Sequence, residues 1–177
     1  MQLLKIYYAY FSPGNTTEKV VSHIASSFQN YPVESINLTD YATRQEDYYF
    51  KENELLIIGV PAYGGRVPAP VVDALRHFTG SNTPVVLVAT YGNRDIDDTL
   101  IELKKNVIDK GFIPVGAASF VCQHTFLKEC AEGRPDEEDL KMAGEFGDKL
   151  KERLRLLVTY DAGDLEVPGT FPYTKPP

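Results

Sequence analysis

Apolar residues in this chain gather in short continuous runs, and these runs predict strands. Residues 55–60 and 84–90 are apolar almost throughout, and residues 3–10 and 112–122 are rich in aliphatic and aromatic side chains. Continuous runs of this length are typical of strands that are buried on both faces of a parallel sheet. Residues 33–38 alternate between apolar and polar side chains and predict a shorter strand near a sheet edge.

Between these runs, apolar residues recur every three or four positions, which is the period of an amphipathic helix. The pattern predicts helices over roughly residues 18–28, 71–78, 96–107 and 136–158. Thr16 and Thr17 stand before the first helix, where N-cap residues are expected. Residues 41–51 are polar and aromatic and give no firm prediction. Strands that alternate with helices predict an α/β fold, in which a five-stranded parallel sheet is covered on both faces to form a three-layer sandwich.

The length of 177 residues favours one domain, expected over residues 1–160. Residues 161–177 are rich in Gly and Pro and are expected to form an extended C-terminal tail or linker. The longest apolar run, residues 55–62, is too short to span a membrane, and the N-terminus reads directly as a strand without a targeting segment. We therefore expect a cytoplasmic protein that does not bind membranes.

Charge and cysteine content narrow the class of function. The net charge of −7 argues against nucleic acid as a partner, since phosphates require basic patches. Cys122 and Cys130 are too few for a disulfide framework or an iron–sulfur cluster, so both are expected to be free thiols. The histidines show no metal-ligand spacing, and we expect no metal site.

A loop rich in hydroxyl and amide side chains follows the first predicted strand, at residues 11–17 (Phe-Ser-Pro-Gly-Asn-Thr-Thr). Backbone N–H groups at a helix start favour an anion. The loop contains no Lys, and the chain has no Gly-x-Gly-x-x-Gly, which excludes the common nucleotide-binding motifs. Neutral donors alone suit a phosphate monoester that is bound and not transferred. The alternative is an ordinary strand-to-helix turn with a Ser/Thr cap.

Two Tyr-Gly pairs follow the next two buried strands, Tyr63-Gly64 and Tyr91-Gly92. A tyrosine can stack on a planar ring, and a glycine lets the backbone approach that ring closely. The carboxyl ends of parallel strands share one edge of the sheet, where ligands of such folds bind. Each loop alone is also consistent with a glycine turn, but the three loops together predict a flat ring with a phosphate tail, which is FMN.

Residues 11–17, 59–68 and 89–98 together resemble the flavodoxin family. With residues 116–126 they are most similar to the flavodoxin-type domain of bacterial proteins that fuse this domain to a four-iron ferredoxin domain. The resemblance covers roughly residues 3–158 and implies strand order 2-1-3-4-5, with FMN at the switch between the first and third strands. Two features depart from it: the glycine of the phosphate loop is shifted, and the cluster cysteines of the ferredoxin half are missing.

The resemblance implies that the first loop binds the phosphate and that the two Tyr-Gly loops line the isoalloxazine. The implied cofactor-binding residues are Ser12, Pro13, Gly14, Asn15, Thr16, Thr17, Pro61, Ala62, Tyr63, Gly64, Gly65, Thr90, Tyr91, Gly92, Asn93 and Asp97. Asn15 stands where the family has glycine, and because Asn tolerates left-handed dihedrals the turn is expected to survive. No residue is required as an acid or base, so we expect no catalytic residue.

The expected function is electron transfer through FMN, in a monomer or weak dimer, with a redox partner such as a ferredoxin-type protein or a reductase. The main alternative is an NAD(P)H-dependent FMN or quinone oxidoreductase, which needs room over the flavin for a second planar substrate. An interaction module that has lost its cofactor stays open. A receiver-type signalling module is disfavoured, because the first strand ends in Tyr10-Phe11-Ser12 and not in clustered acids.

Three further side chains lie in or near the predicted site. His124 follows the fifth strand, and it either contacts the cofactor or a partner or makes a structural hydrogen bond. Arg66 and Arg94, one in each Tyr-Gly loop, either bind an anionic group or are solvated loop charges.

Overall fold

A parallel sheet of five strands forms the centre of the computed structural model, which describes residues 3–156 and 165–174. The strands of this sheet are β1 (Lys5–Tyr10), β2 (Val33–Asn37), β4 (Glu54–Pro61), β6 (Thr83–Tyr91) and β7 (Phe112–Val121), in the order β2-β1-β4-β6-β7. Counted along the chain, this is the order 2-1-3-4-5, so the prediction of the fold class is confirmed.

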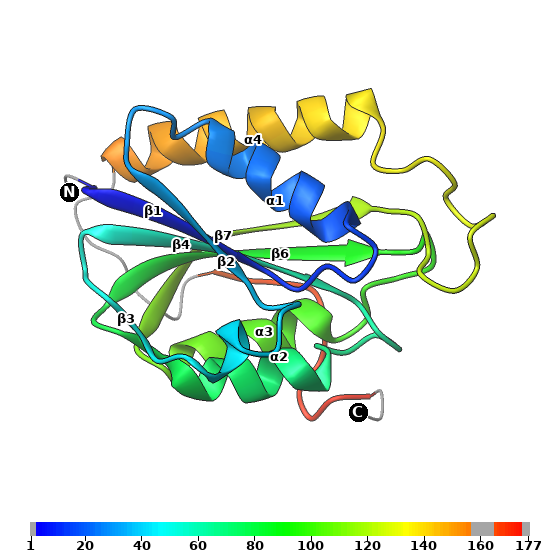
Figure 1. Cartoon of the computed structure of the whole chain (residues 1–177), viewed down its shortest axis with the longest axis horizontal. Coiled ribbons are helices and arrows are strands. Elements are labelled where there is room, and N and C mark those ends of the chain that lie inside the picture. Colours follow the sequence, from blue (N-terminus) through cyan, green and yellow to red (C-terminus); the bar gives the residue numbers. More distant parts are fainter. Residues whose placement is uncertain (1–2, 157–164, 175–177) are drawn as a thin grey trace.

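Helices cover both faces of the sheet (Figure 1). One face carries α1 (Thr16–Ser26) and α4 (Glu137–Leu156), and the other carries α2 (Ala69–Ala74) and α3 (Thr99–Ile108). Two separate hydrophobic clusters, one on each side of the sheet, are built mainly from β4 and β6 against these helices. Gly59 of β4 allows a close approach, since a Cβ there would lie 2.1 Å from Cγ2 of Val21 on α1.

A second sheet of two short strands, β3 (Tyr48–Phe50) and β5 (Phe78–Gly80), lies outside the main sheet. The structure thereby assigns the aromatic stretch that gave no firm prediction from the sequence. The prediction of one continuous helix through Phe78 was wrong: α2 ends at Ala74, a 3₁₀ turn spans Leu75–His77, and Phe78 begins β5. The Phe78 ring lies 5.3 Å from that of Phe50, so aromatic packing competes with helix continuation here.

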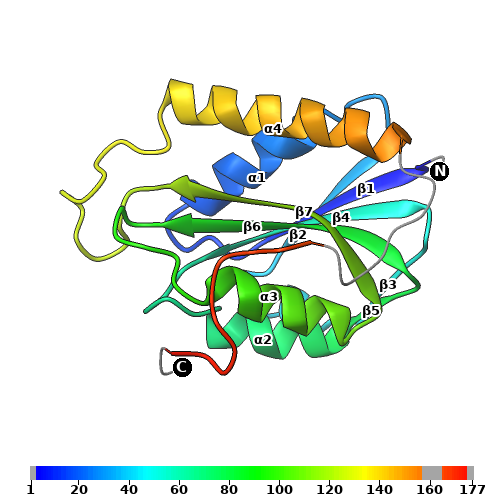
Figure 2. The ribbon, with the colours of Figure 1, turned by 180° about the vertical axis from the view of Figure 1, so that it is seen from behind.

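Residues 165–174 run along α3, as Figure 2 shows in orange-red. Both carboxylate oxygens of Asp98 accept hydrogen bonds from this segment: Oδ1 from Thr170, and Oδ2 from Thr174, in each case from the backbone N–H and the hydroxyl. Lys104 Nζ donates to the carbonyl of Leu165 at 2.7 Å. The predicted boundary between domain and tail, at residues 160–161, falls outside the described residues, as does the predicted end of the last helix at 157–158.

Within the described parts of the chain, no helix is both long and apolar enough to cross a membrane.

Candidate functional site

The switch in strand order lies between β1 and β4, which are neighbours in the sheet. The chain leaves β1 toward α1 on one face and leaves β4 toward α2 on the other (Figure 1). The two connections diverge, and this opens a crevice at the carboxyl ends of the strands. The three predicted loops meet at that edge, together with a fourth segment, residues 122–136, that follows β7.

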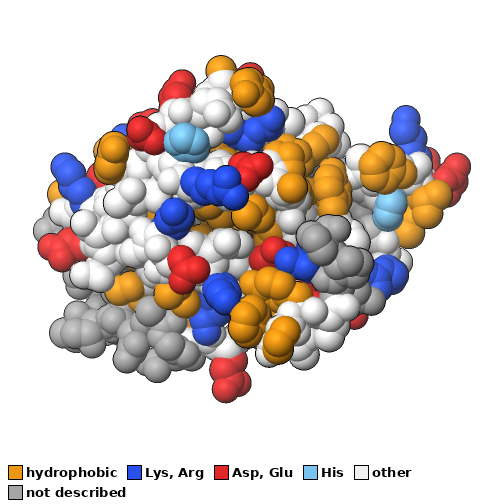
Figure 3. Space-filling model, turned by 90° about the horizontal axis from the view of Figure 1, so that it is seen from below, with side chains coloured by type: hydrophobic (Ala, Val, Ile, Leu, Met, Phe, Trp, Pro, Cys, Tyr) orange, Lys and Arg blue, Asp and Glu red, His pale blue; other side chains and the backbone are white. Residues whose placement is uncertain are grey.

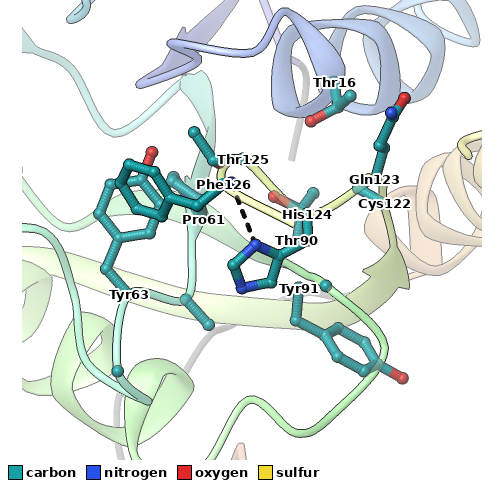
Figure 4. Close-up of a pocket in the computed structure, with 13 residues that line it drawn as sticks. Thr16, Pro61, Tyr63, Thr90, Tyr91, Cys122, Gln123, His124, Thr125 and Phe126 are labelled. Carbon is teal, nitrogen blue, oxygen red and sulfur yellow. Dashed lines mark hydrogen bonds between the residues drawn. The ribbon is translucent and has the colours of Figure 1, made fainter. Parts of the chain in front are cut away.

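A cavity of about 160 Å³ lies at this edge and is shown in Figure 4. Its walls are the two Tyr-Gly loops and the segment after β7. The lining residues are Thr16, Pro61, Ala62, Tyr63, Gly64, Thr90, Tyr91, Gly92, Cys122, Gln123, His124, Thr125 and Phe126. Eight of these, from Thr16 to Gly92, belong to the predicted site, and the five from residues 122–126 do not. We call this space the ring cavity.

A second cavity, of about 390 Å³, lies beside the first and is lined by Pro13, Gly14, Thr16, Gln123, His124, Thr125 and Lys128. We call it the phosphate-loop cavity. Thr16 and the three residues 123–125 line both cavities. The two spaces are therefore adjacent, one beside the Tyr-Gly loops and one beside the hydroxyl-rich loop.

The hydroxyl-rich loop forms a tight turn into α1. Asn15 adopts the left-handed conformation, with φ of 60°, so the turn expected at the shifted glycine is present. The backbone N–H of Asn15 donates to the carbonyl of Ser12, and the Ser12 hydroxyl accepts the N–H of Glu18 at 3.0 Å. The expectation that Thr16 and Thr17 cap the helix was wrong, because both lie inside its first turn and Ser12 takes over a capping bond.

The predicted phosphate donors do not all face the cavity. The Thr17 hydroxyl is buried and shares a 2.8 Å hydrogen bond with the hydroxyl of Thr90, which ties α1 to β6. Of the two threonines in the loop, Thr16 is the one that lines the cavities, and it lines both of them. Lys128 is the cationic residue among those that line the phosphate-loop cavity. Sequence reasoning missed this lysine, because it lies more than 100 positions beyond the loop it faces and no spacing rule links the two.

The loop after β4 is held by a buried ion pair. The Arg66 guanidinium donates from Nε and an Nη to the two oxygens of Glu102 on α3, both at 2.7 Å, and the Val67 N–H donates to the same carboxylate. The Glu102 carboxylate raises the pKa of Arg66 above its ordinary value. Of the two roles considered for Arg66, neither fits, because it is a buried structural cation. Its guanidinium also lies 4.2 Å from the ring centre of Tyr173.

Left-handed glycines shape the same loop. Gly64 and Gly65 have φ values of 59° and 81°. A Cβ added at Gly64 would meet no heavy atom of the described residues within 4 Å, so this backbone borders open space. A Cβ at Gly65 would collide with Asp97, and the Gly65 carbonyl accepts the N–H of Asp98. Gly65 and Asp97 thus contact each other, and Asp97 pairs with Arg94. Neither Gly65 nor Asp97 lines the ring cavity.

In the loop after β6, the position of the Tyr91 side chain departs from the predicted arrangement. Gly92 borders the ring cavity, and Asn93 beyond it has a φ of 60° and is exposed. The phenol of Tyr91 points away from the imidazole of His124 in Figure 4. The imidazole itself packs on Gly92, where a Cβ would lie 2.4 Å from its Cδ2. His124, and not Tyr91, therefore occupies the space beside Gly92.

Residues 122–136, the segment after β7, form the remaining wall of the ring cavity. Hydrogen bonds join this segment to the loop after β6. The Cys122 N–H donates to the Tyr91 carbonyl, and Cys130 Sγ lies 3.1 Å from the Gly92 carbonyl. At the outer end of the segment Phe126 is 81% exposed and Leu127 60%. Figure 3 shows hydrophobic side chains on the surface at the end of the molecule where this segment projects. Residues 116–126 entered the family resemblance, but no pattern there marked Gln123, Thr125 or Phe126 as lining the site.

The residues that line the ring cavity include no Asp, Glu, Lys or Arg. Burial raises the pKa of the Cys122 thiol to about 12, so it is not a thiolate nucleophile near pH 7. Among the described residues, no group of three or more His, Cys, Asp or Glu side chains is placed to hold a metal ion. The site offers hydroxyls, backbone groups, aromatic surface, one imidazole and one lysine, which suit binding more than proton transfer.

A scan of protein-family models and a search of curated proteins gave no match to this chain. Solved structures do match it. An archaeal flavodoxin superposes with a TM-score of 0.59 at 14% identity, over 86% of this chain and 99% of that one. A flavodoxin from Fusobacterium nucleatum bound to flavin mononucleotide gives 0.57 at 18% identity, over 84% and 98%.

The rubredoxin oxygen:oxidoreductase of Desulfovibrio gigas also matches, with a TM-score of 0.58 at 15% identity. The match spans 86% of this chain and 38% of that protein, so the likeness is to one part of a larger enzyme. Identities this low establish the arrangement of the elements and not the chemistry. The chain has the flavodoxin-like α/β fold.

Proposed function

We propose that this protein binds FMN at the carboxyl edge of its sheet and passes electrons to and from a redox partner protein. The observation that carries the proposal is the pair of adjacent cavities, one beside glycine-rich loops with Tyr63 and one beside the hydroxyl-rich loop at the start of α1. A ring joined to a phosphate matches that pair in its arrangement and in its chemistry. A flavodoxin of the same fold is bound to flavin mononucleotide, which supports the assignment.

The residues present fit this cofactor. The phosphate would lie against the turn at Gly14 and the first N–H groups of α1, with the Thr16 hydroxyl as a neutral donor and Lys128 as counter-charge. The ring would lie beside Tyr63 and Gly64, whose backbone borders open space. Bound FMN supplies the one- and two-electron chemistry, and the protein sets its orientation and its electrostatic surroundings.

The size of the ring cavity sets a condition on this proposal. Ligand sites usually enclose about 300–1,000 Å³, whereas this cavity has about 160 Å³. Its volume is limited by His124 and Phe126, which belong to the wall that has most exposure to solvent. We infer that residues 123–127 shift outward to admit the ring while the loop after β4, held by Arg66 and Glu102, keeps its position.

The NAD(P)H-dependent reductase is the second candidate from flavin chemistry. It requires one face of the ring to stay open to a second planar substrate. His124 and Phe126 line the ring cavity on the side that Tyr91 leaves uncovered. When residues 123–127 shift outward to admit the ring, we infer that these two side chains stay against it and cover that face. The arrangement therefore favours a carrier whose electrons arrive through a protein partner.

A titration with two flavins tests the proposal. Purified protein, stripped of any bound flavin, is mixed with FMN or with riboflavin, and flavin fluorescence is followed. We expect FMN to bind at least about tenfold more tightly than riboflavin, because the phosphate adds charge-assisted hydrogen bonds. Thr16→Val should reduce that preference. Thr79→Val, an exposed site on β5, serves as the matched control and should leave it unchanged.

Three outcomes count against the proposal. Absence of any effect on FMN fluorescence would show that no flavin site exists. Equal affinity for FMN and riboflavin would show that the protein has no subsite for the phosphate. Rapid bleaching of the bound flavin by NAD(P)H, with no partner protein present, would show that the protein is an NAD(P)H-dependent reductase and not an electron carrier.

A further inference from the structure

His124 presents an unused hydrogen-bond donor to the ring cavity. Its Nδ1 accepts two backbone N–H groups, from Phe126 at 3.1 Å and from Leu127 at 3.0 Å. An imidazole nitrogen that accepts hydrogen bonds carries no proton, so the proton of the neutral ring sits on Nε2. The segment's own backbone thus fixes the tautomer.

The orientation of the imidazole within its own segment is set as well. The backbone N–H of His124 donates to the Cys130 carbonyl at 3.0 Å, and the imidazole packs on Gly92. In Figure 4, Nδ1 of His124 accepts the hydrogen bond from the backbone N–H of Phe126, and the second ring nitrogen, Nε2, faces the loop that carries Tyr63. Among residues 3–156 and 165–174, no group is hydrogen-bonded to that second nitrogen, although the ring lines both cavities.

We propose that the Nε2–H of His124 donates a hydrogen bond to a carbonyl oxygen of the planar ring that binds in the ring cavity. This inference rests on the proposed function and adds a residue that selects and orients the ring. Most of the cavity lining is aromatic, aliphatic or hydroxyl, so an imidazole N–H donor whose tautomer is set distinguishes a ring edge with carbonyl oxygens from an apolar one. His124 acts as a neutral donor, with Nδ1 engaged by the backbone.

Asparagine and glutamine separate the two roles of the imidazole. In His124→Asn, the amide oxygen can replace Nδ1 as acceptor for the two backbone N–H groups, but no donor reaches the position of Nε2. In His124→Gln, the amide nitrogen reaches toward that position. We expect His124→Asn to weaken FMN binding about tenfold and His124→Gln to weaken it less than about threefold, since one neutral hydrogen bond is at stake.

The nitrogen signals of ¹⁵N-labelled His124 give an independent readout. In the free protein, we expect Nε2 to be protonated and Nδ1 to be bare, and we expect the Nε2 signal to move when FMN is added. His23, exposed on α1, is the internal control and should not move.

The outcomes distinguish this inference from the function on which it rests. Weakened binding by the Asn variant, retained binding by the Gln variant and a moving Nε2 signal support it. If wild-type protein binds FMN and both variants bind it equally well, the inference fails and the proposed function stands. If wild-type protein does not bind FMN, both fail. A proton found on Nδ1 of the free protein would overturn the inference whatever the binding result.

Discussion

Two segments that face each other across the ring cavity are held in different ways. The loop after β4, residues 61–68, is fixed by the buried Arg66–Glu102 pair and by the Val67 N–H on the same carboxylate. The segment after β7, residues 122–136, is held at its outer part by neutral hydrogen bonds and leaves Phe126 and Leu127 exposed. Segments with few buried contacts open at low free-energy cost. The first is therefore the fixed wall of the site and the second its movable cover.

The C-terminal segment strengthens the fixed wall. Asp98 holds Thr170 and Thr174 through its side chain, while its backbone N–H donates to the Gly65 carbonyl. The ring of Tyr173, in the same C-terminal segment, lies under the Arg66 guanidinium. The fixed wall is thus supported by α3 and by residues almost at the end of the chain, whereas the cover is supported at its base, where Arg134 pairs with Asp139.

Breaking the buried pair should have the largest effect. Glu102→Gln leaves the Arg66 cation buried without a charged partner, and we expect the free energy of unfolding to fall by about 3–5 kcal/mol in urea denaturation. Glu152→Gln, in an exposed pair with Arg155, is the control and should change it by less than about 0.5 kcal/mol. Equal effects of the two variants would contradict the account of the fixed wall.

Releasing the C-terminal segment should have the next largest effect. Asp98→Asn replaces one acceptor oxygen by a donor that opposes the N–H groups of the tail, and we expect a loss of about 2–3 kcal/mol. Limited proteolysis should then cut within residues 165–174 before the rest of the domain. The exposed Asp73→Asn provides the comparison. A variant that is cut no faster than wild type would show that Asp98 does not hold the tail.

Weakening the base of the cover should cost less. Asp139 is buried, but its partner Arg134 keeps a third of its side chain open to water, so we expect Asp139→Asn to lower the free energy of unfolding by about 1–2 kcal/mol. Asp148→Asn, exposed on the same helix, is the control.

The free energy of unfolding, measured as the pH is lowered, tests the same pair of Arg134 and Asp139. The Arg134 guanidinium, followed by the N–H of Asp136, holds the pKa of Asp139 below its ordinary value. A carboxyl with a lowered pKa in the folded state stabilises the fold above the pKa of the unfolded chain, about 3.9, and loses this contribution as pH falls through the folded value. Wild type and Asp139→Asn should therefore differ in stability at pH 6 and converge in strong acid. A difference that persists unchanged below about pH 2 would contradict the assignment.

The smallest effect on stability is expected at the outer end of the cover. Phe126→Ser should change the free energy of unfolding by less than about 0.5 kcal/mol, since the ring is exposed, yet it should weaken FMN binding several-fold because Phe126 lines the ring cavity. Leu127→Ser is the matched control, being exposed but outside that lining. Similar FMN affinities of the two variants would show that the cover does not contact the flavin.

The sequence was sufficient for the elements whose hydrophobic pattern decides their structure. Continuous apolar runs predicted the central strands, and the Tyr-Gly loops at their ends predicted one side of the ring cavity. The two-stranded sheet was not predicted, because pairing of Tyr48–Phe50 with Phe78–Gly80 depends on contacts between segments distant in the chain. Local pattern favoured helix at Phe78, and aromatic packing overrode it.

Sequence reasoning expected His124 near the site but did not predict how residues 122–136 close over the ring cavity, for a related reason. His124 and Lys128 acquire their places from the turn of residues 122–130, which is held by single hydrogen bonds such as that from the Gln123 side chain to the Lys128 carbonyl. Arg66 shows the converse: a charge in a glycine-rich loop reads as solvated, and only the approach of Glu102 from α3 makes it structural.

Amide hydrogen exchange with and without FMN tests the central claim most directly, because it locates the ligand on the chain. The account predicts added protection at residues 12–17 and the largest gain at 122–127, with a small gain at 61–68, which is already protected in the free protein, and none at 165–174. Protection that is unchanged at residues 12–17 and 122–127 in saturating FMN, or that appears only elsewhere, would contradict it.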